Sequence, residues 1–413
     1  MVGFFAAKTT VFVAPLFLSK LWDIESYGLF EYCLAWANLL AIPLGAGMPG
    51  AIPYFRLREG RAGREPFQLH AMLTTLLVVA VALLCFLQLI SAEIYLVVLL
   101  AGITALQAIW STELKVEEAP SRASFLESGI FIFILVLCGT SLLAGIRLSL
   151  TSLTWLLGVY VLWLGGALTV GFAWGRPVAQ HLDDYKAVLR FGAPVIITSG
   201  LMVFLTGGGR VLVGQFLSME AVGTYSLFFR VSSGAIIIQT LLSTILFRRI
   251  YDARGPELDR IFAIIMGSVF AVSGGLFIAG PIVLGRIFPE LLLGPPHSVL
   301  FLTLSVQMLL WTGMGLAEGV LYRQNQARAF GWLLLRYCLL FTLGAVFMKL
   351  AGGLNLVSLA QLHMGCMLLA LLAQFKLLRS QGLNLVLARA IPLLAALIYI
   401  GMLVWSFKGK PNG

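Results

Sequence analysis

Residues 23–32 read DIESYGLFEY, and residues 218–227 read SMEAVGTYSL. Glu25 of the first stretch aligns with Glu220 of the second at an offset of 195 residues, and in both stretches a glycine and an aromatic residue follow at the same spacing. Each stretch is a short polar junction between two long apolar runs. The duplicated junction predicts that the chain consists of two related halves.

The composition indicates the class of protein in which these junctions lie. Of the 413 residues, 60% are hydrophobic and 11% are charged, and the mean hydropathy is +0.97. So few polar residues could not cover a soluble protein of this size, and we therefore expect an all-α integral membrane protein. The net charge of +10 is spread over many loops and forms no basic patch, so we expect no nucleic-acid partner.

Thirteen apolar runs are long enough to cross a bilayer as helices, which takes about 20 residues each. The runs are continuous and do not alternate with polar residues, which argues against transmembrane strands. The predicted spans cover approximately residues 2–21, 28–54, 69–90, 94–112, 124–144, 150–173, 190–213, 223–247, 261–284, 298–321, 330–350, 354–375 and 389–407.

The basic residues of the loops predict the orientation in the membrane. One alternating set of loops carries 19 Lys and Arg residues and the other carries seven. Because the more basic loops stay in the cytoplasm, the N-terminus is predicted to be cytoplasmic. The same rule places the C-terminal tail outside, which its two lysines, Lys408 and Lys410, oppose.

The offset of 195 residues aligns the first two runs with the seventh and eighth, so each half has six spans. An even number of spans per half gives a parallel repeat, whose halves leave a central cavity suited to alternating access. We therefore predict two six-helix bundles, residues 1–175 and 176–378, and one extra C-terminal helix with its tail, residues 379–413.

Matching faces of the second and eighth runs, followed in steps of four and three residues, are small or polar. They read Glu31, Ala35, Asn38, Ile42, Gly45 and Pro49 in the first half, and Ser226, Arg230, Ser233, Ile237, Thr240 and Thr244 in the second. A charge at the bilayer centre costs about 2.5–3.5 kcal/mol, so both faces are expected to line a water-filled cavity. Glu31 and Arg230 lie one turn apart on these faces. We expect them to form an ion-pair gate on the outer side, the alternative being that each is paired within its own half.

Two other basic residues lie inside apolar runs. Lys8 is expected either to face the cavity or to extend to the cytoplasmic interface. Arg210, which follows three glycines at residues 207–209, is expected either to face the cavity or to anchor its helix at the outer interface. Glu318 and His363 are single ionisable residues of the tenth and twelfth runs, which makes them candidates for proton coupling or partners of a neighbouring helix.

The motifs of enzymes and metal sites are not evident. The stretch GAGMPG, residues 45–50, matches G-x-G-x-x-G, but it lies inside an apolar run with prolines on both sides, so a kinked and tightly packed helix is the better interpretation. The five cysteines form no C-x-x-C pair, and the four histidines lack the spacing of metal ligands. We therefore expect no metal, no cofactor, no catalytic residue and no enzymatic activity.

Two segments that contain the junctions resemble a known family. Residues 17–36, FLSKLWDIESYGLFEYCLAW, and residues 207–231, GGGRVLVGQFLSMEAVGTYSLFFRV, are similar to segments of the Wzx-type polysaccharide flippases. These flippases belong to the multidrug/oligosaccharidyl-lipid/polysaccharide (MOP) exporter superfamily. The resemblance implies a flippase that moves an undecaprenyl-pyrophosphate-linked oligosaccharide across a bacterial plasma membrane, for polysaccharide biosynthesis of the O-antigen, lipopolysaccharide or teichoic-acid type.

The resemblance also implies a cationic cavity, in which Arg210, Arg230 and Lys8 hold the anionic head group by charge-assisted hydrogen bonds. The sugars need polar partners, for which Asn38 and Gln239 are suitably placed. The expected partners are the lipid-linked oligosaccharide, membrane lipids, H⁺ or Na⁺ as the coupling ion, and the polysaccharide polymerase and glycosyltransferases of the same route.

Two other functions remain open. A cation-coupled multidrug exporter of the same superfamily is favoured by Glu31 and Glu318, whereas the basic residues inside the spans argue against it. A membrane glycosyltransferase or polymerase would need a large outer loop with catalytic residues, and the longest predicted outer loop, residues 286–298, is short.

Overall fold

The structure is a computed structural model of the chain, and it describes residues 2–58, 64–170, 178–246, 249–250, 253–287, 295–324 and 326–408. Within these ranges the chain is helical and contains no strand. It divides into two compact units, Met1–Val203 (unit 1) and Phe204–Gly413 (unit 2). The predicted boundary between bundles, at residues 175 and 176, lies outside the described residues, as do Lys410 and the middle of the predicted outer loop.

Unit 1 is built around α5, which packs against α2, α4, α6 and α8. In this unit α1 also packs against α6 and α7. The elements of unit 1 are α1 (Val2–Leu21), α2 (Ile24–Gly45), α3 (Met48–Pro53), the π-helical turn η1 (Tyr54–Arg58), α4 (Glu65–Phe86), α5 (Ala92–Val116), α6 (Pro120–Glu127), α7 (Gly129–Ala144), α8 (Leu150–Thr169) and most of α9 (Val178–Gly207).

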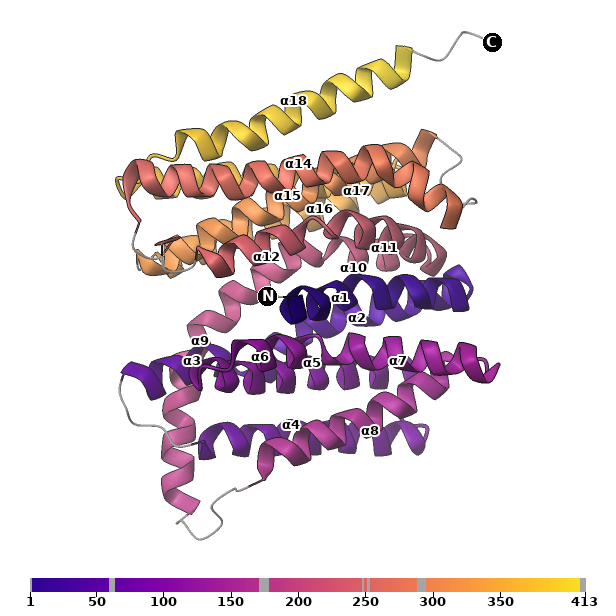
Figure 1. Cartoon of the computed structure of the whole chain (residues 1–413), viewed down its shortest axis with the longest axis vertical. Coiled ribbons are helices and arrows are strands. Elements are labelled where there is room, and N and C mark those ends of the chain that lie inside the picture. Colours follow the sequence, from indigo (N-terminus) through magenta and orange to yellow (C-terminus); the bar gives the residue numbers. More distant parts are fainter. Residues whose placement is uncertain are drawn as a thin grey trace. The chain divides into compact units, whose positions relative to one another are not determined.

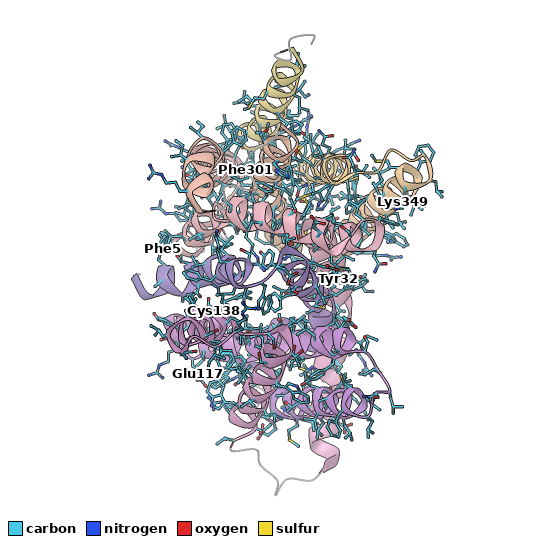
Figure 2. The ribbon with its side chains drawn as sticks, turned by 90° about the vertical axis from the view of Figure 1, so that its right-hand side faces the viewer. Phe5, Tyr32, Glu117, Cys138, Phe301 and Lys349 are labelled. Atoms are coloured by element: carbon cyan, nitrogen blue, oxygen red, sulfur yellow. The ribbon has the colours of Figure 1, made fainter. Side chains whose placement is uncertain are left out.

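Unit 2 is built in a similar way around α15, which packs against α11, α14, α17 and α18 (Figure 1). Phe301 of α15, labelled in Figure 2, is fully buried, and its ring lies 5.8 Å from that of Phe228 and 5.7 Å from that of Phe277. The elements of unit 2 are α10 (Gly209–Phe216), α11 (Met219–Ser233), α12 (Ile236–Ile245), α14 (Gly255–Ile287), α15 (Pro295–Arg323), α16 (Ala327–Leu350), α17 (Leu356–Ser380) and α18 (Val386–Lys408).

The predicted spans fall on these helices. Within the described ranges, nine helices are long and apolar enough to cross a membrane, or up to twelve if each of three bent pairs is one span. The bends measure 61° between α6 and α7, 45° within α9 and 41° between α11 and α12. The first predicted run falls on α1, which is 20 residues long but is not among these candidates, so at most twelve of the thirteen predicted spans have a counterpart in the described ranges. The chain is therefore a multi-pass membrane protein with an all-helical fold.

The two junctions form the same helix start. Asp23 is the N-cap of α2, and its carboxylate accepts a 2.8 Å hydrogen bond from the amide of Ser26. Ser218, at the offset of 195 residues, is the N-cap of α11, and its hydroxyl accepts a 3.2 Å bond from the amide of Ala221. A side-chain oxygen at this position satisfies an amide that the helix leaves without a partner. The repeated stretch thus specifies where the second helix of each unit begins.

The C-terminal helix α18 is anchored in unit 2. It packs against α14 and α15, and its axis diverges from that of α14 toward the C-terminus (Figure 1, yellow). Asp259 of α14 is buried, and its carboxylate accepts hydrogen bonds from the amides of Leu387 and Ala388, at 2.9 and 2.8 Å. These are first-turn amides of α18, so an acidic side chain of one helix caps the start of another. The helix predicted as an extra element is therefore part of the packed unit.

Candidate functional site

A pocket of about 290 Å³ lies inside unit 1, among α2, α3, α5 and α9. Four residues of the small or polar face predicted for the second span line it: Asn38, Ile42, Gly45 and Pro49. The polar side chains of Thr104 on α5 and Ser199 on α9 complete a mostly apolar wall. Such a lining offers a few hydrogen-bonding groups on an apolar surface, as small-molecule sites do.

A helix break gives this pocket its shape. The chain leaves α2 at Ala46 and Gly47, which have positive φ angles of 48° and 72°. A Cβ on Gly47 would lie 2.4 Å from the Cα of Gly192 on α9, and a Cβ on Gly192 would lie 2.6 Å from the carbonyl oxygen of Ala46. Only two glycines allow this approach of the two backbones. The kinked, tightly packed helix inferred from GAGMPG is therefore present.

Glu31, the acidic member of the predicted gate, is fully buried in α2. The hydroxyl of Tyr27, one turn earlier, donates a 3.3 Å hydrogen bond to one of its carboxylate oxygens. Glu31 does not line the unit 1 pocket. Its predicted partner Arg230 belongs to unit 2, and because each unit is described by itself, their pairing stays a prediction.

Lys8 has an ionic partner within unit 1. Its ammonium lies 2.6 Å from a carboxylate oxygen of Glu127, and Lys115 contacts the other oxygen of the same carboxylate. The two lysines and one carboxylate carry a net positive charge. From the sequence, Lys8 was expected either to face the cavity or to extend to the cytoplasmic interface. No sequence pattern indicated Glu127 as its partner. The half-buried side chain of Lys8 is held by this contact.

Arg210 and Arg230 are buried basic residues of unit 2, with exposed fractions of 5% and 6%. The guanidinium of Arg210 lies over the ring of Phe229, 4.6 Å from its centroid, in a cation–π contact. Arg230 lies in the last turn of α11, where its positive charge interacts favourably with the negative end of the helix dipole. Arg230 thus lies in a bent helix pair that could form one span, whereas Arg210 lies on the short helix α10, which directly follows another such pair.

The other polar residues predicted for the eighth span differ in how deeply they are buried. Ser226 and Ser233 are buried, while Gln239 on α12 is half-buried. The break between α11 and α12 lies at Gly234 and Ala235, earlier than the break at Ala46 and Gly47 would be at the offset of 195 residues. The side chain of Thr244 lies outside the described part of the chain.

His363 is buried at the centre of a polar network in unit 2. Its Nε2 lies 2.7 Å from the carbonyl oxygen of Leu205, and because a carbonyl only accepts, Nε2 carries the hydrogen. Its Nδ1 lies 3.5 Å from the hydroxyl of Tyr225, which donates a 3.4 Å bond to Gln307. A Cβ on Gly209 would lie 2.5 Å from the Tyr225 hydroxyl, which explains the need for a glycine before Arg210.

A second histidine makes the same pair of contacts in unit 1. His70 of α4 has its Nε2 2.6 Å from the carbonyl oxygen of Leu44, and its Nδ1 lies 2.8 Å from the hydroxyl of Tyr185. Leu44 lies just before the break at Ala46, and Leu205 lies just before the junction of α9 with α10. Each buried histidine therefore satisfies a carbonyl at a helix end. The role of His70 could not be predicted from the sequence, because its partners are distant in the chain.

Glu318, the other coupling candidate, lies on α15 and is half-buried. The side chain of Tyr322, one turn later, forms a hydrogen bond with it. Among the described residues, no group of three or more His, Cys, Asp or Glu side chains could hold a metal ion.

The fold has counterparts among solved structures. The lipid II flippase MurJ, in an inward closed conformation, is similar with a TM-score of 0.61 at 12% identity, over 99% of this chain and 94% of that chain. An inward-facing multidrug resistance MATE family transporter of the MOP superfamily is similar with a TM-score of 0.51 at 14% identity, over 100% of this chain and 96% of that chain. No protein-family model and no curated protein sequence matches. The chain therefore shares the fold of these two solved proteins along nearly its whole length.

Proposed function

We propose that this chain, a multi-pass membrane protein with a MOP-superfamily fold, is a flippase for a lipid-linked oligosaccharide and works by alternating access. The observation that carries the proposal is the burial of Arg210 and Arg230 in unit 2. A charged side chain inside a membrane-spanning helix is costly, and such residues usually serve a substrate or an ion. Two arginines favour an anionic substrate.

A polyprenyl-pyrophosphate head group fits this chemistry. Pyrophosphate presents several anionic oxygens, and guanidinium groups bind such oxygens with two parallel, charge-assisted hydrogen bonds. In unit 1, the pocket beside Asn38, Thr104 and Ser199 offers the mixed polar and apolar surface that sugars require. Gln239 is the corresponding polar residue that we assign to sugar binding in unit 2.

The finer assignments rest on the resemblance to the Wzx-type flippases. We propose undecaprenyl pyrophosphate as the lipid, a bacterial plasma membrane with a cytoplasmic N-terminus, and O-antigen or related polysaccharides as the product. The polymerase and glycosyltransferases of the route are the proposed partners. We also retain the parallel repeat of two six-helix bundles, to which the matched N-caps at Asp23 and Ser218 lend support.

The gate and the coupling ion are further parts of the proposal. Glu31 and Arg230 are proposed to pair when the outer side is closed. Proton coupling is proposed at Glu318 or His363, both of which have hydrogen-bonding partners through which a proton could be exchanged. Lys8 is proposed to contribute charge jointly with Lys115, since they share the carboxylate of Glu127.

A cation-coupled multidrug exporter is the second candidate. The full burial of Glu31 favours it, because an acidic residue within a membrane helix suits a cationic substrate or a coupling cation. Arg210 and Arg230 argue against it, because both would repel a cationic drug.

The two candidates can be distinguished in proteoliposomes that contain the purified full-length chain. Flipping of a fluorescent undecaprenyl-pyrophosphate oligosaccharide is expected to fall at least about tenfold in Arg210→Gln and Arg230→Gln, because a hydrogen bond to a charged group contributes about 1.5–3 kcal/mol. Arg286→Gln, at an exposed arginine in the last turn of α14, is the matched control and should keep its rate. Equal rates in all three variants, or transport of a cationic dye and not of the lipid, would refute the flippase proposal.

A further inference from the structure

A basic groove lies on α16, α17 and α18 of unit 2, apart from the residues assigned to transport. It consists of two adjoining hollows of about 730 and 440 Å³. Both hollows are lined by Tyr337, Ala373 and Lys376, so they form one continuous surface, called here the α16–α18 groove.

The groove is strongly cationic. Arg336 and Lys376 line the larger hollow, and Lys376, Arg379 and Arg389 line the smaller one. All four side chains are exposed, and no acidic residue lines either hollow. In the described part of the chain, none of the four forms an ion pair. Asp259 approaches the start of α18 near Arg389, but its carboxylate accepts hydrogen bonds from the amides of Leu387 and Ala388.

The groove lies at one end of three membrane-spanning helices. Arg336 lies in the first half of α16, Arg379 in the last turn of α17 and Arg389 in the first turn of α18. Because the chain enters α16, leaves α17 and enters α18 at the same membrane surface, these charges share one interface. The loop charges predict this interface to be the cytoplasmic one.

Apolar side chains border the charges. Trp332 lines the larger hollow and is 57% exposed, and Leu369 lines the smaller hollow and is 48% exposed. Leu369 lies about two turns further into the membrane along α17 than Lys376. Tryptophan is typical of the interface between lipid and water, and exposed leucine within a span contacts acyl chains. The groove therefore combines a charged mouth, bordered by Trp332 at the interface, with an apolar continuation into the bilayer at Leu369.

We infer that the α16–α18 groove binds the head group of diphosphatidylglycerol, an anionic glycerophospholipid with two phosphates. Each hollow holds one phosphate, and Lys376, common to both hollows, lies between the two. Arg336 contacts the first phosphate, and Arg379 and Arg389 contact the second, with the planar forks that suit phosphate oxygens. The acyl chains lie against Leu369, and Trp332, one turn nearer the start of α16 than Arg336, borders the head group. Basic pockets between membrane helices are known to hold head groups of this kind.

The test is lipid binding to the purified full-length protein in detergent, measured by native mass spectrometry with diphosphatidylglycerol as the probe. The triple variant Arg336→Gln/Lys376→Gln/Arg379→Gln is expected to weaken binding at least about tenfold. The single variant Lys376→Gln should weaken it more than Arg336→Gln or Arg379→Gln alone. An unchanged affinity in the triple variant would overturn the inference.

A matched control removes the same number of charges elsewhere. The variant Arg254→Gln/Arg260→Gln/Arg328→Gln changes three exposed arginines of unit 2 that lie at helix starts outside the groove. It should bind diphosphatidylglycerol within about twofold of the parent protein. An equal loss in both triple variants would show that the lipid responds to surface charge alone, and the groove would have no role.

Two further probes identify the chemistry. Phosphatidylglycerol, with one phosphate, should bind more weakly than diphosphatidylglycerol, and inorganic pyrophosphate should not displace the lipid at equal concentration. Equal binding of the two lipids would refute the arrangement with two phosphates. Displacement by pyrophosphate would show a site for a soluble anion, which would refute a lipid site.

Discussion

Gly47 and Gly192 meet backbone to backbone and hold α2, α3 and α9 in the arrangement that opens the unit 1 pocket. Gly47 also has a positive φ of 72°, which a side chain would make unfavourable. Gly50 lies on the same pocket, but a Cβ there would meet nothing within 4 Å. The sequence G-x-G-x-x-G thus contains glycines with different roles, and only the structure separates them.

Replacing these glycines should have different effects on stability. Gly47→Ala and Gly192→Ala are each expected to lower the free energy of unfolding by about 1–3 kcal/mol, because the added methyl group forces the two backbones apart. Gly50→Ala is the matched control and should leave the melting temperature unchanged. Thermal unfolding in detergent, followed by tryptophan fluorescence, measures all three. Similar melting temperatures for Gly47→Ala and Gly50→Ala would contradict the close contact.

The partners of single residues were the least predictable part of the site. Lys8 and Glu127 are 119 residues apart in the chain, and no periodicity connects them. His363 was recognised as an ionisable residue in a span, yet its bond to Leu205 depends on the packing of α17 against the end of α9. Arg210 was recognised as a basic residue of an apolar run, expected to face the cavity or the outer interface, whereas its contact with Phe229 could not be predicted.

At the scale of the helix, length and continuity of apolar residues located up to twelve of the thirteen predicted spans in the described part of the chain. The breaks inside the spans were harder to locate. Prolines mark the region of Ala46, but no proline marks the 61° bend between α6 and α7. There, Gly129 begins α7, and a Cβ on it would lie 2.4 Å from the hydroxyl of Tyr160 on α8. The close approach of another helix determines that bend, so it cannot be read from local sequence.

The N-cap of α2 should make a pH-dependent contribution to stability. Hydrogen bonds from the amide and hydroxyl of Ser26 hold the pKa of Asp23 below its ordinary value of 3.8. The ionised carboxylate is thus the stabilising form. Its contribution is complete above the unfolded-state pKa of about 3.9, and it is lost as the pH falls through the lower pKa of the folded state.

Asp23→Ala is therefore expected to lower the free energy of unfolding by about 1 kcal/mol at neutral pH. The difference from the parent protein should shrink as the pH falls below 3.8. Asp23→Asn keeps a capping oxygen without a titrating group, so its difference from Asp23→Ala should stay constant with pH. Denaturant unfolding in detergent at a series of pH values measures these differences. A constant gap between Asp23→Ala and the parent protein down to pH 2 would show that ionisation of Asp23 has no part in the cap.

At the scale of the whole molecule, the course of α18 decides on which side of the membrane the chain ends. Asp259, near the start of α14, caps the start of α18, so the two helices begin at the same membrane surface. Both pack against α15. The segment Val386–Val404 is long and apolar enough to cross, with a mean hydropathy of 2.1. The structure therefore favours a complete crossing over a helix that lies at the interface, despite the lysines of the tail.

A crossing by α18 predicts opposite locations for two reporter fusions. Alkaline phosphatase, active only outside the cytoplasm, should be inactive when fused after Ser380, at the end of α17, and active when fused after Gly413. Green fluorescent protein should give the reverse pattern, because it folds in the cytoplasm. The comparison does not depend on the charge rule, since only the difference between the two positions is tested. If both fusions report the same side, α18 does not cross the membrane, and the Asp259 cap would then hold a helix that lies along the surface. Asp259→Asn, which removes the charge and one of the two capping hydrogen bonds, should preserve the crossing, because α18 also packs against α14 and α15.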